Sequence, residues 1–219
     1  MALAIFDLDE TLIAGDSDAL WGEFVVKKGL VTDPDYDKKN HGFHVDYMKG
    51  ELDIFAYLHF CLKVLSEYSV EQLHTLREEF FETVIDPLVL EKGIEKIQMH
   101  REQGDFIMII SATNCFVVDR IAERFGVDKV LATNIEIVDG AYTGKPLGTP
   151  CFREGKIENL NGWLKANTDK NLNGSYFYSD SRNDIPLLSL VDHPIAIDPD
   201  DVLKAHANAN GWQIQSFKM

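Results

Sequence analysis

Residues 2–12 read ALAIFDLDETL, an apolar run that ends in two aspartates, Asp7 and Asp9, placed two positions apart. A near-continuous apolar run of this kind is typical of a β-strand that is buried on both faces of a parallel sheet. Taken alone, two acids at a strand end are more often a solvated turn than a functional site. The stretch therefore predicts the fold class. A functional prediction requires other polar residues at the same edge of the sheet.

Two later segments, 106–110 and 176–178, are apolar in the same way, and each follows a turn that contains glycine. The first is followed by SATN and the second by SDSRND, so each ends in small polar residues. The carboxyl ends of parallel strands meet at one edge of an open α/β sheet, where ligands bind. Further strands are expected at 130–132 and 195–197, with a hairpin turned at Asp139-Gly140.

Between the first two strands the periodicity becomes helical. Apolar pairs four residues apart, such as Leu20 with Phe24, indicate one helix, and Ser69 with Gln72 forms a capping box that opens another. We therefore expect residues 16–88 to form a helical cap inserted into an α/β core of residues 1–15 and 89–219. Elsewhere helices alternate with strands, which predicts a Rossmann-like, doubly wound, mainly parallel sheet.

The overall charge excludes some classes of partner. The chain has 219 residues with 21 Lys and Arg against 36 Asp and Glu, a net charge of −15. Such a charge repels nucleic acid and anionic membrane surfaces. No apolar stretch approaches the roughly 18 residues of a membrane span, and the three cysteines form no CxxC pair. We expect a cytoplasmic protein that binds neither nucleic acid nor membrane.

Several further polar groups follow the first two aspartates at a strand or helix end. In chain order the set is Asp7, Asp9, Ser111, Lys156, Asp180 and Asp184. Asp-x-Asp-x-Thr, a strand-terminal Ser, a helix-borne Lys and an Asp-x-x-Asn-Asp loop together resemble the four motifs of the haloacid dehalogenase superfamily of phosphohydrolases. The resemblance covers nearly the whole chain, and its ordered set of motifs is far more specific than any one of them.

The resemblance implies Mg²⁺-dependent hydrolysis of a small phosphomonoester through a phospho-aspartate. Asp7 would be the nucleophile, and Asp9 would protonate the leaving alkoxide and later activate water. Magnesium prefers oxygen ligands and offsets the repulsion between a carboxylate and a phosphate dianion. The implied metal-binding residues are Asp7, Asp9 through its backbone carbonyl, Asp180 and Asp184, with Thr11 and Asn183 supporting them.

The implied phosphate-binding residues are Ser111, the adjacent Ala112 and Lys156. Ser111 would donate a hydrogen bond to a phosphoryl oxygen, and Lys156 would supply a point charge near Asp7. Lys145 competes for this last role. Lys156 is preferred because it opens a helix shortly before the third strand, where this family places its lysine.

The inserted cap resembles that of the phosphoserine-phosphatase-like branch, in which an acid nine residues after the nucleophile binds the substrate ammonium. Asp16 holds that position and Asp18 lies nearby, although both could simply cap the next helix. His59 falls where that branch has an Arg for the substrate carboxylate. A neutral His lacks the permanent charge that suits a carboxylate, so phosphoserine is only the second candidate substrate. An amino-alcohol phosphate with a ring, such as histidinol phosphate, is the preferred substrate. The cap aromatics considered are His44, Tyr47, Phe55 and Tyr57.

Two other classes of function stay open from the sequence. Receiver-type signalling domains also combine an acid cluster, a phosphorylated Asp and a Lys, but they have no leaving alcohol for an acid such as Asp9 to protonate. Transfer of the phosphoryl group to a second alcohol would use the same residues as hydrolysis. Repeated release of phosphate separates the enzyme from the switch, and added acceptor alcohols reveal transfer.

Overall fold

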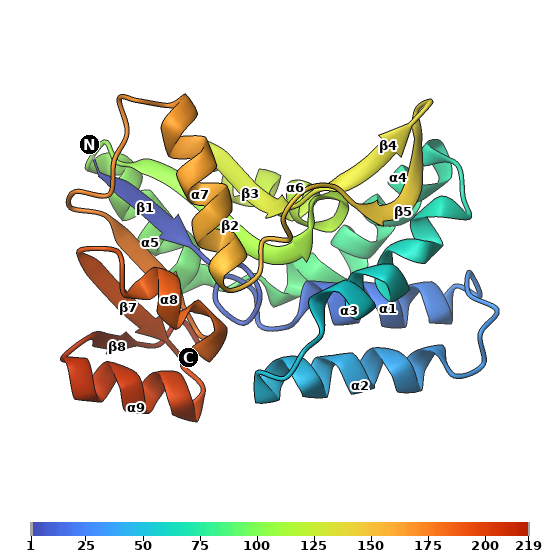
Figure 1. The fold of residues 1–219 in the computed structure, drawn as a ribbon, viewed down its shortest axis with the longest axis horizontal. Helices are drawn as coiled ribbons and strands as arrows, with labels where there is room; N and C mark the ends of the chain where they lie inside the picture. The colour runs from blue at the N-terminus through green and yellow to red at the C-terminus, as the bar shows by residue number, and fades with distance from the viewer. Residues whose placement is uncertain (1, 219) are drawn as a thin grey trace.

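The computed structural model describes residues 2–218 and contains a six-stranded parallel sheet in the order β3-β2-β1-β6-β7-β8 (Figure 1). A separate antiparallel hairpin is formed by β4 and β5. The strands are β1 Leu3–Phe6, β2 Phe106–Asn114, β3 Lys129–Thr133, β4 Ile135–Val138, β5 Ala141–Pro146, β6 Tyr176–Ser179, β7 His193–Ile197 and β8 Gln213–Gln215. The predicted strands, the hairpin and the α/β class are confirmed. The short, polar β8 gave no strand signal in the sequence.

Helices cover both faces of the sheet. In Figure 1, α7 crosses in front of the strands while α5 lies behind them. The helices are α1 Ser17–Lys27, α2 Tyr36–Lys49, α3 Ile54–Cys61, α4 Val70–Phe80, α5 Glu91–Glu102, α6 Cys115–Phe125, α7 Glu154–Ala166, α8 Ile185–Leu188 and α9 Asp201–Asn210. Among residues 2–218, no helix combines the length and the apolar character that crossing a bilayer requires.

Two apolar cores follow from this layering. One contains side chains of α5 and α6, such as Ile97 and Phe116, and the other contains side chains of α7 and α9, such as Leu160 and Leu203. β1 separates the two cores because Phe6 faces the first and Ile5 faces the second. This alternation explains the near-continuous apolar run in the sequence, since both faces of the strand are buried.

The order in which the chain adds strands to the sheet reverses at β1. This strand pairs with β2 on one side and with β6 on the other, so successive connections leave toward opposite edges. The Asp7 amide continues the ladder by donating to the Tyr178 carbonyl at 2.9 Å. A crevice forms outside the carboxyl ends of the strands at such a switch point, and this is where open α/β sheets bind ligands.

Residues 16–88 contain helices and turns, and the short helices η1 Leu62–Ser66, η2 Phe81–Ile85 and η3 Asp86–Leu88 complete this segment. We call it the helical insertion. Its apolar side chains, among them Trp21 and Leu58, belong to the same core as Phe6 and Phe116 of the α/β part. Asp16 caps α1 and the predicted capping box of Ser69 and Gln72 opens α4. Its behaviour as a separate cap domain stays a prediction.

The β4–β5 hairpin lies against the helical insertion, although it follows β3 in sequence. Gly144 of β5 has a φ of +76° and approaches η1 so closely that an added Cβ would lie 3.1 Å from Ser66 Oγ. Glycine is suited to both demands because it adopts positive φ and has no side chain. The hairpin therefore belongs to the surroundings of the insertion, which the sequence did not indicate.

Candidate active site

Asp7 follows the last residue of β1 and is 3% exposed. Lys156, in the first turn of α7, is equally buried, and its Nζ donates to Asp7 Oδ1 at 2.9 Å and to Asp184 Oδ2 at 2.8 Å. Burial alone would lower the pKa of Lys156, but the Asp184 and Asp7 carboxylates hold it above its ordinary value. Lys156 is therefore a permanent buried cation between two acids. Lys145 lies exposed on β5, outside this cluster.

The loop after β6 supplies the other acids. Asp184 ends the short helix η4 Arg182–Asp184, and its Oδ2 accepts from Ser179 Oγ at 2.7 Å as well as from Lys156. Asp180 is fixed by Thr11, whose hydroxyl donates to Asp180 Oδ1 at 3.2 Å and accepts from the Asp180 amide at 3.1 Å. Thr11 thus joins the loop after β1 to the loop after β6.

Asp9 is held by a different set of donors. Its Oδ1 accepts from the Ser17 amide at 2.7 Å, and its Oδ2 accepts from Thr113 Oγ1 at 2.9 Å and from Ser111 Oγ at 3.3 Å. Ser111 and Thr113 lie in the carboxyl-terminal half of β2, so the neighbouring strand orients Asp9. In this arrangement the Ser111 hydroxyl faces Asp9.

These carboxylates are poorly solvated and crowd one another. Burial raises the pKa of Asp7 to about 7; Lys156 lowers it, and the neighbouring Asp184 and Asp9 raise it. Burial, then the charge of Asp16, raises the pKa of Asp9 to about 6. Burial, followed by Asp7 and Asp184, also raises the pKa of Asp180 well above its ordinary value. One ammonium therefore faces an excess of negative charge, which favours a bound cation.

The carboxylates near Asp7 suit a magnesium site, which needs few protein ligands, better than a metal site formed entirely by protein side chains. No group of three or more His, Cys, Asp or Glu side chains in residues 2–218 is arranged to hold a metal by itself. Magnesium usually retains several waters and needs only one or two carboxylates together with substrate phosphate. Asp7 and Asp180, at the ends of adjacent strands, supply that number of carboxylates.

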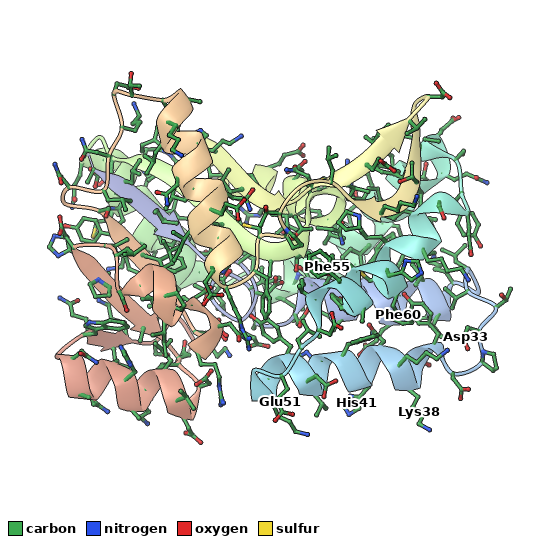
Figure 2. All side chains as sticks on the ribbon, in the orientation of Figure 1. Asp33, Lys38, His41, Glu51, Phe55 and Phe60 are labelled. Atoms are coloured by element: carbon green, nitrogen blue, oxygen red, sulfur yellow. The ribbon has the colours of Figure 1, made fainter. Side chains whose placement is uncertain are left out.

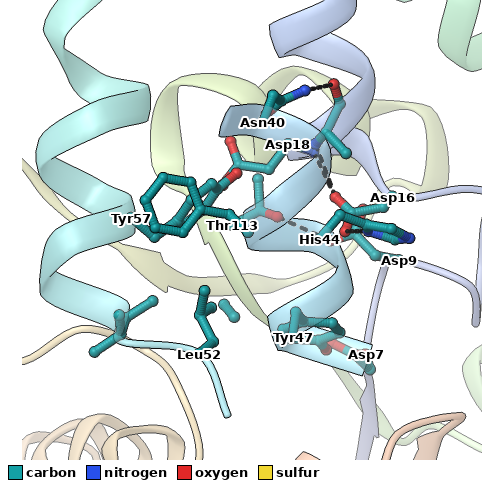
Figure 3. Close-up of a pocket in the computed structure, with 14 residues that line it drawn as sticks. Asp7, Asp9, Asp16, Asp18, Asn40, His44, Tyr47, Leu52, Tyr57 and Thr113 are labelled. Atoms are coloured by element: carbon teal, nitrogen blue, oxygen red, sulfur yellow. Dashed lines mark hydrogen bonds and ion pairs between the residues drawn. The ribbon is translucent and has the colours of Figure 1, made fainter. Parts of the chain in front are cut away.

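A pocket opens from Asp7 and Asp9 into the helical insertion (Figure 3). Helices α1, α2 and α3 and the end of β2 form its walls, which are partly acidic and partly aromatic. The lining residues are Asp7, Asp9, Asp16, Asp18, Ala19, Asn40, Phe43, His44, Tyr47, Leu52, Ile54, Tyr57, Ala112 and Thr113. The wall combines acids and aromatics with no Lys or Arg among these described residues.

Asp16 is engaged twice. Its Oδ1 caps α1 by accepting from the Asp18 and Ala19 amides at 3.0 and 2.9 Å, and its Oδ2 lies 3.0 Å from His44 Nδ1 of α2. This hydrogen bond is the main cause that raises the pKa of His44. Asp16 thus caps α1 and lines the pocket, and its predicted binding of a substrate ammonium stays a prediction.

Asp18 lies deeper in the same pocket and is 6% exposed. Its Oδ1 accepts from Asn114 Nδ2 at 2.8 Å, and Tyr57 lies beside it in the pocket wall. Burial, then the charges of Asp16 and Asp9, raises the pKa of Asp18 well above its ordinary value. A bound cation would relieve this unfavourable burial of negative charge.

Two of the cap residues considered from the sequence do not reach the pocket. His59 is exposed and lines a separate cavity with Tyr36 and Lys63, and Phe55, labelled on α3 in Figure 2, is 63% exposed. The prediction that His59 faces the substrate is therefore not supported by its position. His44, Tyr47, Tyr57 and Ala112 do line the pocket, and Ser111, next to Ala112 in the chain, is buried.

Sequence reasoning missed Thr113, Asn40 and Phe43 in the pocket wall. Thr113 carried a signal, because it lies two residues after Ser111 and alternate residues of a strand share a face. Asn40 and Phe43 gave none, since their place depends on how α2 packs against α1. Asn40 Nδ2 donates to the Ala19 carbonyl at 2.9 Å and so joins these helices.

Comparison with known proteins agrees with this geometry. A model of the haloacid dehalogenase-like hydrolases matches residues 4–189. The chain belongs to this family. It is 42% identical over 219 residues to a histidinol-phosphatase of Neisseria meningitidis, with 99% of each chain covered. Its family and hydrolytic class, predicted from the ordered motifs, are thereby confirmed.

Two solved structures resemble this member of the haloacid dehalogenase-like hydrolases. A Bordetella pertussis protein with unknown function is 40% identical, with a TM-score of 0.92 and 99% of each chain covered. A substrate-bound phosphoserine phosphatase is 21% identical, with a TM-score of 0.72, 99% of this chain covered and 93% of the other. The second likeness shows that the two chains share a fold.

Proposed function

We propose that this hydrolase is a phosphomonoesterase that uses Asp7 as its nucleophile. The observation that carries the proposal is the placement of Asp7 between Lys156 and the pocket, with Asp9 two residues further on and held by the adjacent strand. A carboxylate attacks phosphorus without needing a base, and the nearby ammonium offsets the repulsion between it and the phosphate dianion. Residues 16–88 act as the cap that encloses the substrate.

In the first step an Asp7 carboxylate oxygen forms a bond to phosphorus while the bond between phosphorus and the ester oxygen breaks. Asp9 gives its proton to the departing alkoxide, and the product alcohol leaves. In the second step a water attacks the aspartyl phosphate, Asp9 takes the proton from this water, and inorganic phosphate and free Asp7 result. A pKa of about 6, raised by burial and then by Asp16, suits Asp9 to both directions of proton transfer near neutral pH.

We assign the metal to Mg²⁺, which would supply positive charge to the phosphoryl oxygens. Asp7, the Asp9 backbone carbonyl and Asp180 would hold it, with Asp184 and Asn183 shaping the loop. Lys156 bridges Asp7 and Asp184 and would place a further positive charge beside the phosphate. Ser111, with the neighbouring Ala112, would bind a phosphoryl oxygen once the substrate arrives.

The pocket wall favours an aminated substrate with a ring, and we propose histidinol phosphate. Asp16 and Asp18 suit an ammonium group, while Phe43, Tyr47 and Tyr57 suit a flat ring. The relative from Neisseria meningitidis carries this activity in its name. Phosphoserine is the second candidate, but its carboxylate would meet acids in a wall whose described residues include no Lys or Arg.

A panel of phosphorylated metabolites assayed for phosphate release with Mg²⁺ tests the proposal. Histidinol phosphate, phosphoserine, phosphoethanolamine and a chromogenic aryl phosphate are the informative members. We expect repeated turnover, with the highest kcat/KM for histidinol phosphate, and loss of turnover in Asp7→Asn. A single stoichiometric phosphorylation would instead indicate a receiver-like switch, and a new ester formed with added alcohols would indicate phosphotransfer.

A further inference from the structure

The carboxyl-terminal end of α2 is fastened to the α/β part by side chains from the catalytic loops. Three hydrogen bonds reach backbone carbonyls at this end, two in the last turn of the helix and one at its C-cap residue. They run from Asn183 Nδ2 to the Tyr47 carbonyl (3.3 Å), from Arg182 Nη1 to the Lys49 carbonyl (3.4 Å) and from Arg153 Nη2 to the Gly50 carbonyl. We call this set of contacts the α2 clamp.

The chemistry of the α2 clamp is complementary. The last carbonyls of a helix have few intrahelical partners and carry the negative end of the helix dipole. Here the guanidinium groups of Arg153 and Arg182 and the side-chain amide of Asn183 donate hydrogen bonds to such carbonyls. Among the three acceptors, the Tyr47 carbonyl also accepts from the Gly50 amide at 2.9 Å. Arg153 lies three residues before Lys156, and Asn183 lies between Asp180 and Asp184, so the donors come from the same segments that surround Asp7.

Arg153 is held in an unusual backbone conformation. Its φ is +50° with ψ at −119°, a region that residues other than glycine rarely adopt. Its Nε donates to Asn183 Oδ1 at 3.1 Å, and its guanidinium carbon lies 4.9 Å from the centre of the Phe152 ring. Such a conformation persists only where the surroundings determine it, and it directs Arg153 toward Gly50.

Gly50, in the helical insertion, allows the end of α2 to approach the two arginines. It ends α2 with a φ of +74°, and an added Cβ would lie 3.3 Å from both Arg153 Nη2 and Arg182 Cδ. The close approach of the helix end to the two arginines therefore depends on the missing side chain.

The α2 clamp fixes Tyr47, whose carbonyl is one of its three acceptors. The Tyr47 side chain lines the pocket together with Asp7 and lies beside Asp7 in Figure 3. A tyrosine phenol ordinarily has a pKa of about 10 and therefore carries its proton at neutral pH. A neutral O–H group from the insertion is thereby placed at the end of the pocket where phosphate would bind.

We propose that Tyr47 contacts the phosphoryl group of the substrate as a hydrogen-bond donor, and that Arg153 is a positioning residue that acts through Tyr47. The proposal rests on the phosphomonoesterase activity proposed above. A hydroxyl that binds the phosphate, unlike Asp16 or Asp18, acts on every phosphate ester regardless of the alcohol attached.

Tyr47→Phe tests the contact directly. A hydrogen bond to a charged group accounts for roughly 10- to 100-fold in kcat/KM, so we expect a loss of that size with both histidinol phosphate and the aryl phosphate. Tyr142→Phe is the matched control, because Tyr142 lies on β5 against Phe116 and outside the pocket. Unchanged kcat/KM in Tyr47→Phe, or a loss confined to the aminated substrate, overturns the proposal.

A double-mutant cycle tests the positioning role. We expect Arg153→Ala to lower kcat/KM in the natural background and to have little further effect in a Tyr47→Phe background. Equal losses in the two backgrounds overturn the role of Arg153. Gly50→Ala, which disturbs the same contact from the other side, should reproduce the Arg153→Ala result and keeps the test available if Arg153→Ala fails to fold.

A second measurement separates this proposal from the proposed function. Inorganic phosphate, added with Mg²⁺, should raise the Tm of the natural protein and raise it less in Tyr47→Phe than in Tyr142→Phe. If the natural protein released no phosphate from any ester, the phosphomonoesterase proposal would fail, while this difference would still support the Tyr47 contact. Equal Tm shifts in both variants would refute the contact.

Discussion

Lys156 Nζ lies 2.9 Å from Asp7 Oδ1, with both side chains almost fully buried, and the same nitrogen lies 2.8 Å from Asp184 Oδ2. The first motif, the helix-borne lysine and the acidic loop are thus joined at one atom. A buried ion pair of this kind adds little net stability, because desolvation offsets the attraction. The pair does orient Asp7, because it fixes Oδ1 against Lys156, while under the proposed mechanism Oδ2 would be the oxygen available to attack phosphorus.

Lys156→Met should lower the free energy of unfolding by about 3–5 kcal/mol at neutral pH, since it leaves two buried carboxylates without their cation. Activity should fall at least about 100-fold, because the charge beside the phosphate is also lost. Lys145→Met is the matched control and should leave both quantities nearly unchanged, since Lys145 is exposed. Urea unfolding and kcat/KM measure the two effects. If Lys145→Met proved the more damaging change, the assignment of the lysine would be wrong.

Magnesium should stabilise the protein more at pH 7.5 than at pH 5.5. The pKa values of Asp7 and Asp9, ordinarily 3.8, are raised by burial to about 7 and about 6. The folded state therefore binds these protons more tightly than the unfolded chain. The contribution of both groups to stability falls as pH rises from about 4 through about 7.

A cation that needs the deprotonated acids reverses this loss and binds more tightly as pH rises over the same range. Scanning calorimetry with EDTA or with Mg²⁺ at the two pH values measures the effect. In Asp7→Asn the difference between pH values should shrink. A stabilisation by Mg²⁺ that is equal at both pH values would contradict the assignment of these acids to the metal.

Asp16→Asn should separate the two tasks of Asp16. An amide oxygen still accepts from the Asp18 and Ala19 amides, so the α1 cap survives and stability should change by less than about 1 kcal/mol. The lost charge should raise KM about tenfold or more for an aminated phosphate, whereas the aryl phosphate should be affected only slightly, through the lower pKa of Asp9. Asp16→Ala, which also removes the cap, should destabilise the protein further. Equal losses of Asp16→Asn on both substrates would reduce Asp16 to a structural residue.

The α/β end of the site could be predicted because each of its residues lies at the carboxyl end of a recognisable strand, follows one or opens a helix. Parallel strands bring their carboxyl ends together whatever the connections do, so Asp7, Ser111 and Asp180 meet once the strands are known. The choice of lysine also required knowing where α7 begins. The structure places Lys156 rather than Lys145 beside Asp7.

The cap end could not be predicted in the same way, because it depends on how helices rotate and cross. Ile54 and Tyr57 of α3 face the pocket, and His59, two residues after Tyr57, points about 200° around the helix from it. The pairing of His44 with Asp16 joins two helices with no pattern in common. The α2 clamp depends on a positive φ at Arg153, which no sequence rule assigns to arginine.

The crossing of α1 and α2 depends on Gly22, and Gly22→Ala should damage the pocket from a distance. An added Cβ at Gly22 would lie 2.5 Å from Asn40 Nδ2, and Asn40 is 4% exposed and lines the pocket. Asn40 would have to move and would lose its bond to the Ala19 carbonyl. We expect a net loss of about 1–2 kcal/mol in the free energy of unfolding, after the gain in helix propensity is included, and a higher KM.

Gly42→Ala in α2 is the matched control, because an added Cβ there meets nothing within 4 Å. This change should stabilise the helix by up to about 1 kcal/mol and leave KM as it is. Urea unfolding and substrate titration of the two variants give the comparison. The same substitution is made in neighbouring helices, so changes of opposite sign in the free energy of unfolding would isolate the contact with Asn40. Changes of the same sign would show that this contact does not set the shape of the pocket.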